Sequence, residues 1–159
     1  MEQPVTIVVV DDSRPARSGL QALLTDSPQV KVIGEAANGQ EAITLIEQQQ
    51  PQVVLMDAQM PGMDGIQVAQ IIKQRWPAIK VIILTMYPAY ETQVQAAGVD
   101  GFLIKGGPVD DLLRAVIGSP NFSADNLLTP DVLGEINSGL PAQKNERSDL
   151  NGGSTIGKF

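Results

Sequence analysis

Two patterns of apolar and polar residues alternate along this chain between about residue 5 and residue 118. Short apolar runs rich in Val and Ile are typical of strands buried on both faces, and stretches with apolar residues at helical spacing separate them. Five such strand-then-helix units follow one another, which predicts an α/β fold with a parallel sheet. The predicted strands are residues 5–10, 30–36, 53–56, 80–84 and 101–104.

The same pattern predicts one domain and a less regular extension. We assign residues 1–118 to the domain and residues 119–138 to a linker-like segment with a short helix near residues 129–136. Residues 139–159 are rich in Gly, Ser, Asn and mixed charges, too polar to offset the entropy of ordering, so we expect a flexible tail. Within the domain, residues 86–98 have the weakest apolar periodicity, and we expect their helix to be the least firmly packed.

Acidic residues follow two of the predicted strands. Asp11 and Asp12 come directly after the first strand, and Asp57 comes directly after the third. Because ligands bind outside the carboxyl ends of the strands in open parallel sheets, we expect these side chains to meet at one site. Carboxylates at close range repel one another and need a proton or a cation, and Mg²⁺ prefers oxygen ligands. The sequence therefore predicts a magnesium site at this edge of the sheet.

Two further polar residues stand at the ends of later strands, Thr85 after the fourth and Lys105 after the fifth. A carboxylate acts as a nucleophile toward phosphorus when a metal offsets its charge, and phosphoryl oxygens need a hydrogen-bond donor and a fixed cation. We therefore predict that Asp57 is the nucleophile and that Thr85 and Lys105 contact the phosphoryl group. Taken singly, each residue has an ordinary alternative: Asp11 and Asp12 as helix N-caps, Asp57 as a turn residue, Thr85 as a cap and Lys105 as a solvated charge.

Composition narrows the classes of function. The chain contains neither Cys nor His, which excludes disulfides, thiolate or histidine metal sites, a Ser-His-Asp triad and a phosphohistidine donor within it. Its formal net charge is -7, which opposes non-specific adhesion to nucleic acid or anionic lipid and favours a protein partner or a cation. The sequence shows neither a leader segment nor an apolar stretch of roughly 18 residues, so we expect a soluble cytoplasmic protein with no membrane partner.

The chain closely resembles the receiver domain of bacterial two-component response regulators over about residues 6–118. The resemblance rests on Asp11-Asp12, Asp57, the run Met60-Pro61-Gly62-Met63-Asp64-Gly65, Thr85 and Lys105, in that order. It implies a flavodoxin-like, doubly wound five-stranded parallel sheet, (βα)5. It also implies that Asp57 accepts a phosphoryl group from a sensor histidine kinase or a phosphotransfer protein. The ligands of Mg²⁺ would be Asp11, Asp12, Asp57 and the main-chain carbonyl of Gln59.

The same resemblance implies a conformational switch and little enzymatic activity. Thr85 and Phe102 stand at the family's switch positions, so they would change position when Asp57 is phosphorylated. Such a domain is a phosphoacceptor and not an enzyme, beyond self-phosphotransfer and slow autodephosphorylation.

The segments Leu84-Thr85-Met86-Tyr87 and Gly101-Phe102-Leu103-Ile104-Lys105 look most like the NarL/FixJ type of receiver. Members of that type usually continue into a DNA-binding helix-turn-helix. The residues after 118 are too few for the customary linker plus that module, and they lack a basic recognition helix. Either an output domain is missing or the chain is a single-domain regulator, and DNA is a partner only in the first case. A homodimer is a further partner that the sequence leaves open.

Two residues depart from the common receiver pattern. Gly106 stands where many receivers have Pro after the active-site Lys, and Met86 stands where a small residue is common. We expect Met86 to narrow access to the phosphoryl group and to slow its hydrolysis.

Two alternative functions remain open. The first is an aspartate-dependent phosphohydrolase, which normally needs a further acid-base carboxylate and a cap over the substrate, and this chain has no insertion large enough for such a cap. The second is a pseudo-receiver that binds partners without phosphorylation.

Overall fold

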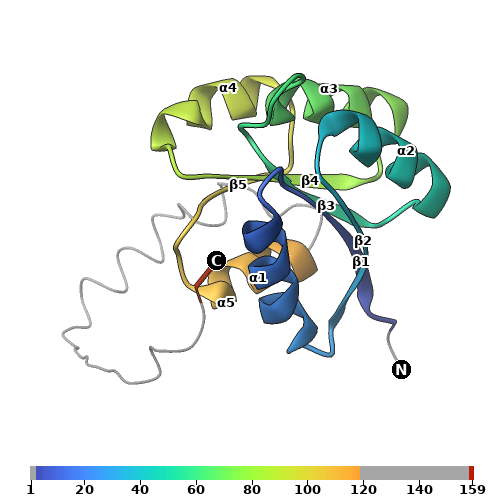
Figure 1. The fold of residues 1–159 in the computed structure, drawn as a ribbon, viewed down its shortest axis with the longest axis vertical. Coiled ribbons are helices and arrows are strands. Elements are labelled where there is room, and N and C mark those ends of the chain that lie inside the picture. The colour runs from blue at the N-terminus through green and yellow to red at the C-terminus, as the bar shows by residue number, and fades with distance from the viewer. Residues whose placement is uncertain (1–2, 119–157) are drawn as a thin grey trace.

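The computed structural model describes residues 3–118 and 158–159 (Figure 1). The strands are β1 (Val5–Val10), β2 (Val30–Ala36), β3 (Val53–Asp57), β4 (Lys80–Thr85) and β5 (Gly101–Ile104). The helices are α1 (Arg14–Thr25), α2 (Gly39–Gln49), α3 (Gly65–Arg75), α4 (Glu91–Ala96) and α5 (Val109–Ile117), and a 3-10 turn, η1 (Pro88–Tyr90), precedes α4. All five predicted strands are confirmed, but β3 and β4 extend one residue further than predicted and include Asp57 and Thr85 themselves.

The strands form one parallel sheet in the order β2-β1-β3-β4-β5, which confirms the predicted doubly wound α/β fold. The chain leaves β1 toward β2 on one side and later returns to place β3 on the other side. Strand order therefore reverses between β1 and β3, and a crevice opens at such a switch point beyond the carboxyl ends of the strands. Asp11 and Asp57 stand at these two strand ends.

Both faces of the sheet are covered by helices, which explains why its strands read as continuous apolar runs. In β1, Ile7 and Val9 join an apolar cluster with residues of α1 and α5, whereas Val8 and Val10 join the cluster on the opposite face. Figure 1 shows α2, α3 and α4 on this second side of the sheet and α1 and α5 on the first.

The loop between β3 and α3 is held tightly against the end of β3. A Cβ atom on Gly65 would stand 2.0 Å from the main-chain oxygen of Asp57, so only glycine allows α3 to begin there. Asp64 caps α3 through a capping box in which it and Gln67 bond each other's main-chain N–H groups. This packing and capping place the start of α3 directly behind Asp57 and leave Asp64 with a structural role.

The helix of the fourth connection is short. α4 contains six residues, of which only Val94 is buried, whereas α3 contains eleven with four buried. This agrees with the weak periodicity of residues 86–98. Within the described part of the chain, no helix has the length and apolar character that a bilayer crossing requires.

The extension predicted after the domain is described only at its last two residues. The linker-like segment, residues 119–138, and residues 139–157 of the predicted tail lie outside the described residues. Lys158 and Phe159 are described, and they contact the domain.

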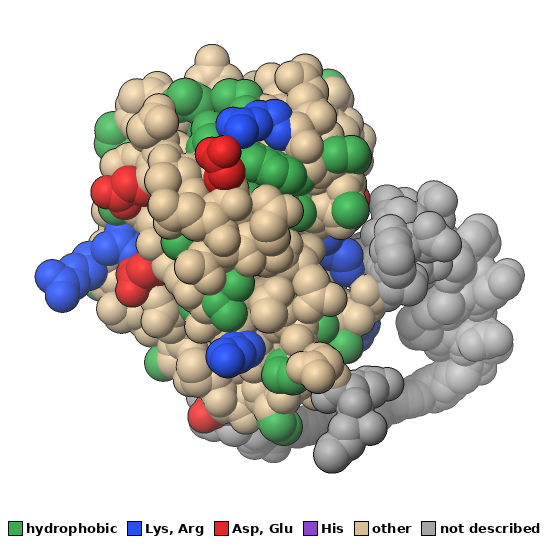
Figure 2. Space-filling view, turned by 90° about the vertical axis from the view of Figure 1, so that its right-hand side faces the viewer, with side chains coloured by type: hydrophobic (Ala, Val, Ile, Leu, Met, Phe, Trp, Pro, Cys, Tyr) green, Lys and Arg blue, Asp and Glu red, His purple; other side chains and the backbone are tan. Residues whose placement is uncertain are grey.

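The face of the molecule in Figure 2 carries acidic and basic side chains scattered among uncharged ones. No patch of a single charge gathers over the described residues on that face.

Candidate functional site

Three carboxylates meet at the carboxyl ends of β1 and β3. One oxygen from each of Asp11, Asp12 and Asp57 lies within 4.8 Å of the others. Asp11 and Asp57 are buried, at 5% and 9% exposure, whereas Asp12 is exposed. The N-cap alternative for the two neighbouring acids is wrong, because Ser13 caps α1 by accepting a hydrogen bond from the main-chain N–H of Ala16. The meeting of the three acids that the strand pattern predicts is therefore present.

Lys105 reaches this cluster from the end of β5. Its Nζ stands 2.9 Å from Oδ2 of Asp11 and 3.5 Å from Oδ2 of Asp57. The ammonium group is only partly exposed, so this ion pair is screened by water less than a surface pair. The alternative of a solvated surface lysine is thereby excluded.

The other oxygens of the two buried acids are held by the main chain. Oδ1 of Asp11 accepts a hydrogen bond from the N–H of Ser13 at 2.9 Å, and Oδ1 of Asp57 accepts one from the N–H of Gln59 at 3.2 Å. Each carboxylate is thus fixed on one side by the residue two positions later and directs its second oxygen toward Lys105. Asp57 does occupy a local turn, but as a member of a charged cluster and not as an isolated turn residue.

Burial and charge act in opposite directions on the two central groups. Burial raises the pKa of Asp57 above its usual value, and the neighbouring Lys105 charge opposes this rise without cancelling it. Burial alone lowers the pKa of Lys105, but its hydrogen bond to Asp11 and the charges of Asp57 and Asp11 outweigh burial, so that its pKa is raised. Lys105 therefore keeps its positive charge at neutral pH beside a carboxylate that is costly to ionise.

Thr85 ends β4 beside this cluster and is 1% exposed. Its hydroxyl oxygen accepts a hydrogen bond from the N–H of Tyr87 at 3.1 Å. This is the bond expected if Thr85 serves only as a local cap. The main-chain oxygen of Thr85 accepts a bond from the N–H of Lys105, which joins the ends of β4 and β5. Because a hydroxyl that accepts one bond still carries its proton, Thr85 remains able to donate.

Comparison with known proteins identifies the family. The family model described as the response regulator receiver domain matches residues 7–117. The chain belongs to this receiver family. It is 33% identical over 117 residues to the transcriptional regulatory protein DegU of Brevibacillus brevis, covering 72% of this chain and 50% of DegU. It is 32% identical to the nitrate/nitrite response regulator NarL of Escherichia coli strain K12, covering 72% of this chain and 54% of NarL.

Solved structures support the same assignment. The signal receiver domain of NarL from Mycobacterium tuberculosis is 35% identical, with a TM-score of 0.68, and the match covers 74% of this chain and all of that one. The isolated receiver of RcsB from Salmonella enterica, studied with the phosphomimetic BeF3-, is 28% identical, with a TM-score of 0.64 and coverage of 70% and 84%. The predicted likeness to the NarL type is confirmed, and this receiver spans about half the length of the curated relatives it matches.

The remaining three residues that the sequence singled out differ in their surroundings. Phe102 is half-buried on β5 and packs against the apolar cluster under α3 and α4, together with Tyr90 and Val99. Its role as a switch stays a prediction. Met86 follows Thr85 and is 61% exposed. Gly106, with a φ of 94°, takes a left-handed conformation after Lys105, and no described peptide bond is cis.

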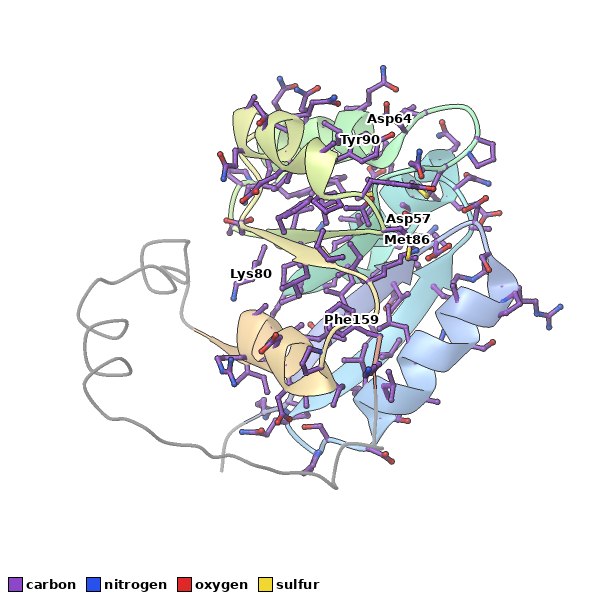
Figure 3. All side chains as sticks on the ribbon, turned by 90° about the vertical axis from the view of Figure 1, so that its left-hand side faces the viewer. Asp57, Asp64, Lys80, Met86, Tyr90 and Phe159 are labelled. Carbon is purple, nitrogen blue, oxygen red and sulfur yellow. The ribbon has the colours of Figure 1, made fainter. Side chains whose placement is uncertain are left out.

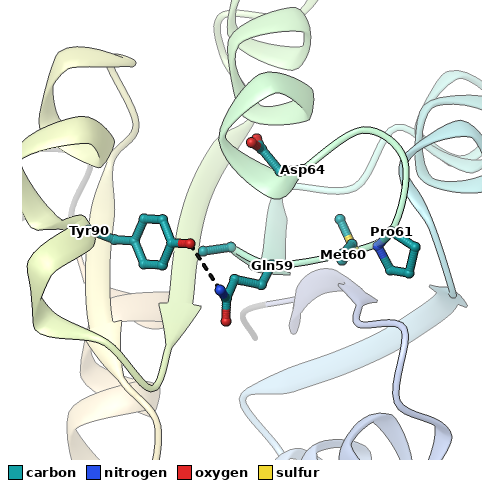
Figure 4. A pocket seen from close by; sticks show the side chains of 6 residues that line it. Gln59, Met60, Pro61, Asp64 and Tyr90 are labelled. Atoms are coloured by element: carbon teal, nitrogen blue, oxygen red, sulfur yellow. Dashed lines mark hydrogen bonds between the residues drawn. The ribbon is translucent and has the colours of Figure 1, made fainter.

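One contact of the receiver was not predicted from the sequence. Figure 4 shows the side-chain amide of Gln59 donating a hydrogen bond to the phenol oxygen of Tyr90, at 2.9 Å, across a pocket of about 400 Å³. Tyr90 in turn stacks edge-on against Tyr87, with ring centroids 6.3 Å apart. The loop after Asp57 is thereby linked to η1. No local sequence signal pairs these segments, since the contact depends on how β3 and β4 lie side by side.

Proposed function

We propose that Asp57 accepts a phosphoryl group from a phosphohistidine of a sensor histidine kinase or a phosphotransfer protein. A carboxylate oxygen of Asp57 attacks phosphorus, the bond from phosphorus to the imidazole nitrogen breaks, and its electron pair returns to the donor's imidazole. The observation that carries this proposal is the meeting of three carboxylates and one lysine at a buried strand-end site.

The contacts of Lys105 and Thr85 suit them to the transferred group. Lys105 lies 3.5 Å from Asp57 and keeps its charge, so a small movement brings its ammonium group onto a phosphoryl oxygen. The hydroxyl of Thr85 has a proton left to donate to a second oxygen. These two groups offset the negative charge that develops on the phosphoryl oxygens during transfer. Such electrostatic stabilisation of the transition state is usually the largest single contribution to the rate.

The acidic cluster fits Mg²⁺. One oxygen from each of Asp11, Asp12 and Asp57 lies within 4.8 Å of the others, and carboxylate oxygens are ligands that Mg²⁺ prefers, so these three side chains would hold the ion. The main-chain carbonyl of Gln59 would complete the protein ligands. When bound, the ion offsets the negative charge of the carboxylates and of the incoming phosphoryl oxygens. Asp12, being exposed, is the ligand most free to adjust.

The output that we propose is a change of surface. Phosphorylation adds roughly -1.5 to -2 charge at pH 7, which draws Thr85 toward the new group and lets Phe102 turn inward from its half-buried position. The surface formed by α4, β5 and α5 then changes and binds a partner. Because DegU of Brevibacillus brevis is a transcriptional regulatory protein, we propose control of transcription wherever an output domain accompanies this receiver.

Phosphorylation with a small donor tests the proposal. The protein is incubated with acetyl phosphate and Mg²⁺, and its intact mass is measured. We expect one phosphoryl increment that Asp57→Asn abolishes, while the matched control Asp64→Asn, which alters only the cap of α3, keeps it. Absence of any uptake, with acetyl phosphate and with beryllofluoride alike, would contradict the proposal and favour a pseudo-receiver. Rapid multiple-turnover hydrolysis of varied phosphomonoesters would instead favour a phosphohydrolase.

A further inference from the structure

Two residues far along the chain lie against the loop that follows the active-site lysine. The main-chain oxygen of Phe159 accepts a hydrogen bond from the N–H of Gly106, and the N–H of Phe159 donates to the oxygen of Gly107 at 3.2 Å. Lys158 pairs with Pro108 in an antiparallel bridge. Figure 1 shows this end of the chain between α1 and α5, and Figure 3 shows Phe159 on the same side of the sheet. Lys158 and Phe159 are therefore bound through their main chain as a short strand is.

The side chain of Phe159 forms part of the wall of an apolar groove beside the site. The groove, which we call the α1 groove, is lined by Ala16, Gly19, Leu20 and Leu23 of α1, by Leu84, Asp11 and Lys105, and by Lys158 and Phe159 themselves. A volume of about 460 Å³ stays open between these residues. The four α1 residues recur at helical spacing and form one stripe. The Phe159 ring is partly buried and packs against the apolar cluster that α1 and α5 share.

The groove has room for more than it holds. A Cβ atom on Gly19 would meet nothing within 4 Å, so this part of α1 is open. The edge that binds the main chain is also accessible, because Gly106 and Gly107 present no side chains to an approaching strand. An apolar stripe next to an open main-chain edge is the arrangement in which a peptide adds to a fold through backbone hydrogen bonds and places one side chain in a pocket.

We infer that the α1 groove is a docking site for an extended segment bearing an aromatic ring, and that Lys158 and Phe159 of this same chain occupy it. The docked segment clamps the loop of Gly106 to Pro108 directly after Lys105. Since Lys105 is bonded to Asp11 and Asp57, the segment limits the movement of the lysine and covers the α1 side of the site. This last consequence rests on the proposed function, whereas the docking does not.

Amide hydrogen exchange of the full chain tests the docking, with Phe159→Ala compared with the unchanged protein. Loss of the ring should release the segment and make the Gly106 amide exchange about tenfold faster, which corresponds to about 1.4 kcal/mol. The amide of Leu55, in the centre of β3, should exchange at an unchanged rate. Equal exchange of Gly106 in both proteins would overturn the inference.

Dilution distinguishes the chain's own segment from that of a second copy. Protection of Gly106 should stay constant over about a hundredfold dilution, because an intramolecular contact does not depend on protein concentration. Loss of protection on dilution would assign the occupant to a neighbouring molecule and overturn the inference. These measurements need neither Mg²⁺ nor a phosphoryl donor, so they fail or succeed independently of phosphorylation at Asp57.

Discussion

Two half-buried lysines stand at opposite ends of the sheet, and their surroundings differ. Lys80, at the start of β4, donates from Nζ to the main-chain oxygens of Ala115 and Gly118, both at 2.9 Å. Burial lowers the pKa of Lys80, and the charge of Asp100 only partly opposes this. Lys105, just after β5, places its Nζ beside the carboxylates of Asp11 and Asp57. These carboxylates raise the pKa of Lys105, although it is half-buried like Lys80.

The difference shows that neither residue type nor burial reveals the role of a lysine. Lys80 satisfies carbonyls at the end of α5, which are otherwise without helical partners, and so stabilises the fold. Lys105 keeps its charge beside acids that repel one another, and so prepares a site for another negative group. Replacing each by Met, which removes the charge and preserves much of the stem, separates the two roles.

The largest effect is expected for Lys105→Met. Removing one hydrogen-bond donor to a developing oxyanion costs about 10²–10³-fold in rate in enzymes. We expect loss of the Lys105 ammonium donor to slow phosphorylation of Asp57 by acetyl phosphate by a similar factor. The measurement is the initial rate of phosphoryl uptake by intact mass. Lys80→Met serves as the matched control and should take up phosphate at the normal rate. Comparable slowing in the two variants would contradict the separate roles of Lys80 and Lys105.

The next effect is a loss of stability in Lys80→Met. Two carbonyls at the end of α5 lose a charged donor. Part of the lost stability is offset, because folding no longer pays the desolvation cost of burying the ammonium group. We expect the free energy of unfolding to fall by about 1–2 kcal/mol, measured by urea denaturation. A variant as stable as the original protein would show that the bonds to Ala115 and Gly118 contribute nothing net.

A smaller effect is the pH dependence of stability from Lys80. The pKa of Lys80 in the folded protein lies below its value of about 10.4 in the unfolded chain. Between these two pKa values the unfolded state binds more protons, so the free energy of unfolding should rise with pH toward 10.4 relative to Lys80→Met. Lys105, with its raised pKa, has the opposite sign: its stabilising contribution is lost as the pH rises above about 10.4. Urea denaturation across this range without Mg²⁺ measures both, and a pH-independent difference between Lys80→Met and the original protein contradicts the assignment.

The smallest effect concerns access to the site. If Met86 narrows the approach of water to the phosphoryl group, Met86→Ala should speed loss of phosphate by about threefold. A change in the activation free energy of about 1.36 kcal/mol would speed it tenfold, so the expected change is smaller than that. The exposure of Met86, 61%, is the reason for expecting a small change. The decay of the phosphorylated mass after removal of the donor measures it, and an unchanged decay rate removes this role.

The strands and the meeting of the acids were predictable from the sequence because each rests on a local pattern. An apolar run predicts a buried strand, and parallel strands bring their carboxyl ends together, so Asp11 and Asp57 had to be neighbours. The ends of β3 and β4 were misplaced by one residue, since the last strand residues are defined by pairing of Asp57 with Leu84 and of Thr85 with Ile104. Such partners leave no mark in the local sequence.

The contacts that sequence reasoning missed join segments without shared periodicity. The amide of Gln59 reaches Tyr90, the ammonium group of Lys80 reaches the end of α5, and the main chain of Phe159 reaches Gly106. In each case a polar group finds its partner in a segment far away along the chain. Residue type predicts only that such groups need partners, and the fold decides which partners they find.

The site of phosphorylation is the most direct test of the account. After incubation with acetyl phosphate and Mg²⁺, borohydride reduces an aspartyl phosphate to homoserine, and peptide mass mapping then locates the changed residue. The account predicts homoserine at position 57, dependent on Mg²⁺ and lost in Asp57→Asn. Homoserine at position 11 or 12 in the original protein, or phosphate retained on another residue type, would contradict it.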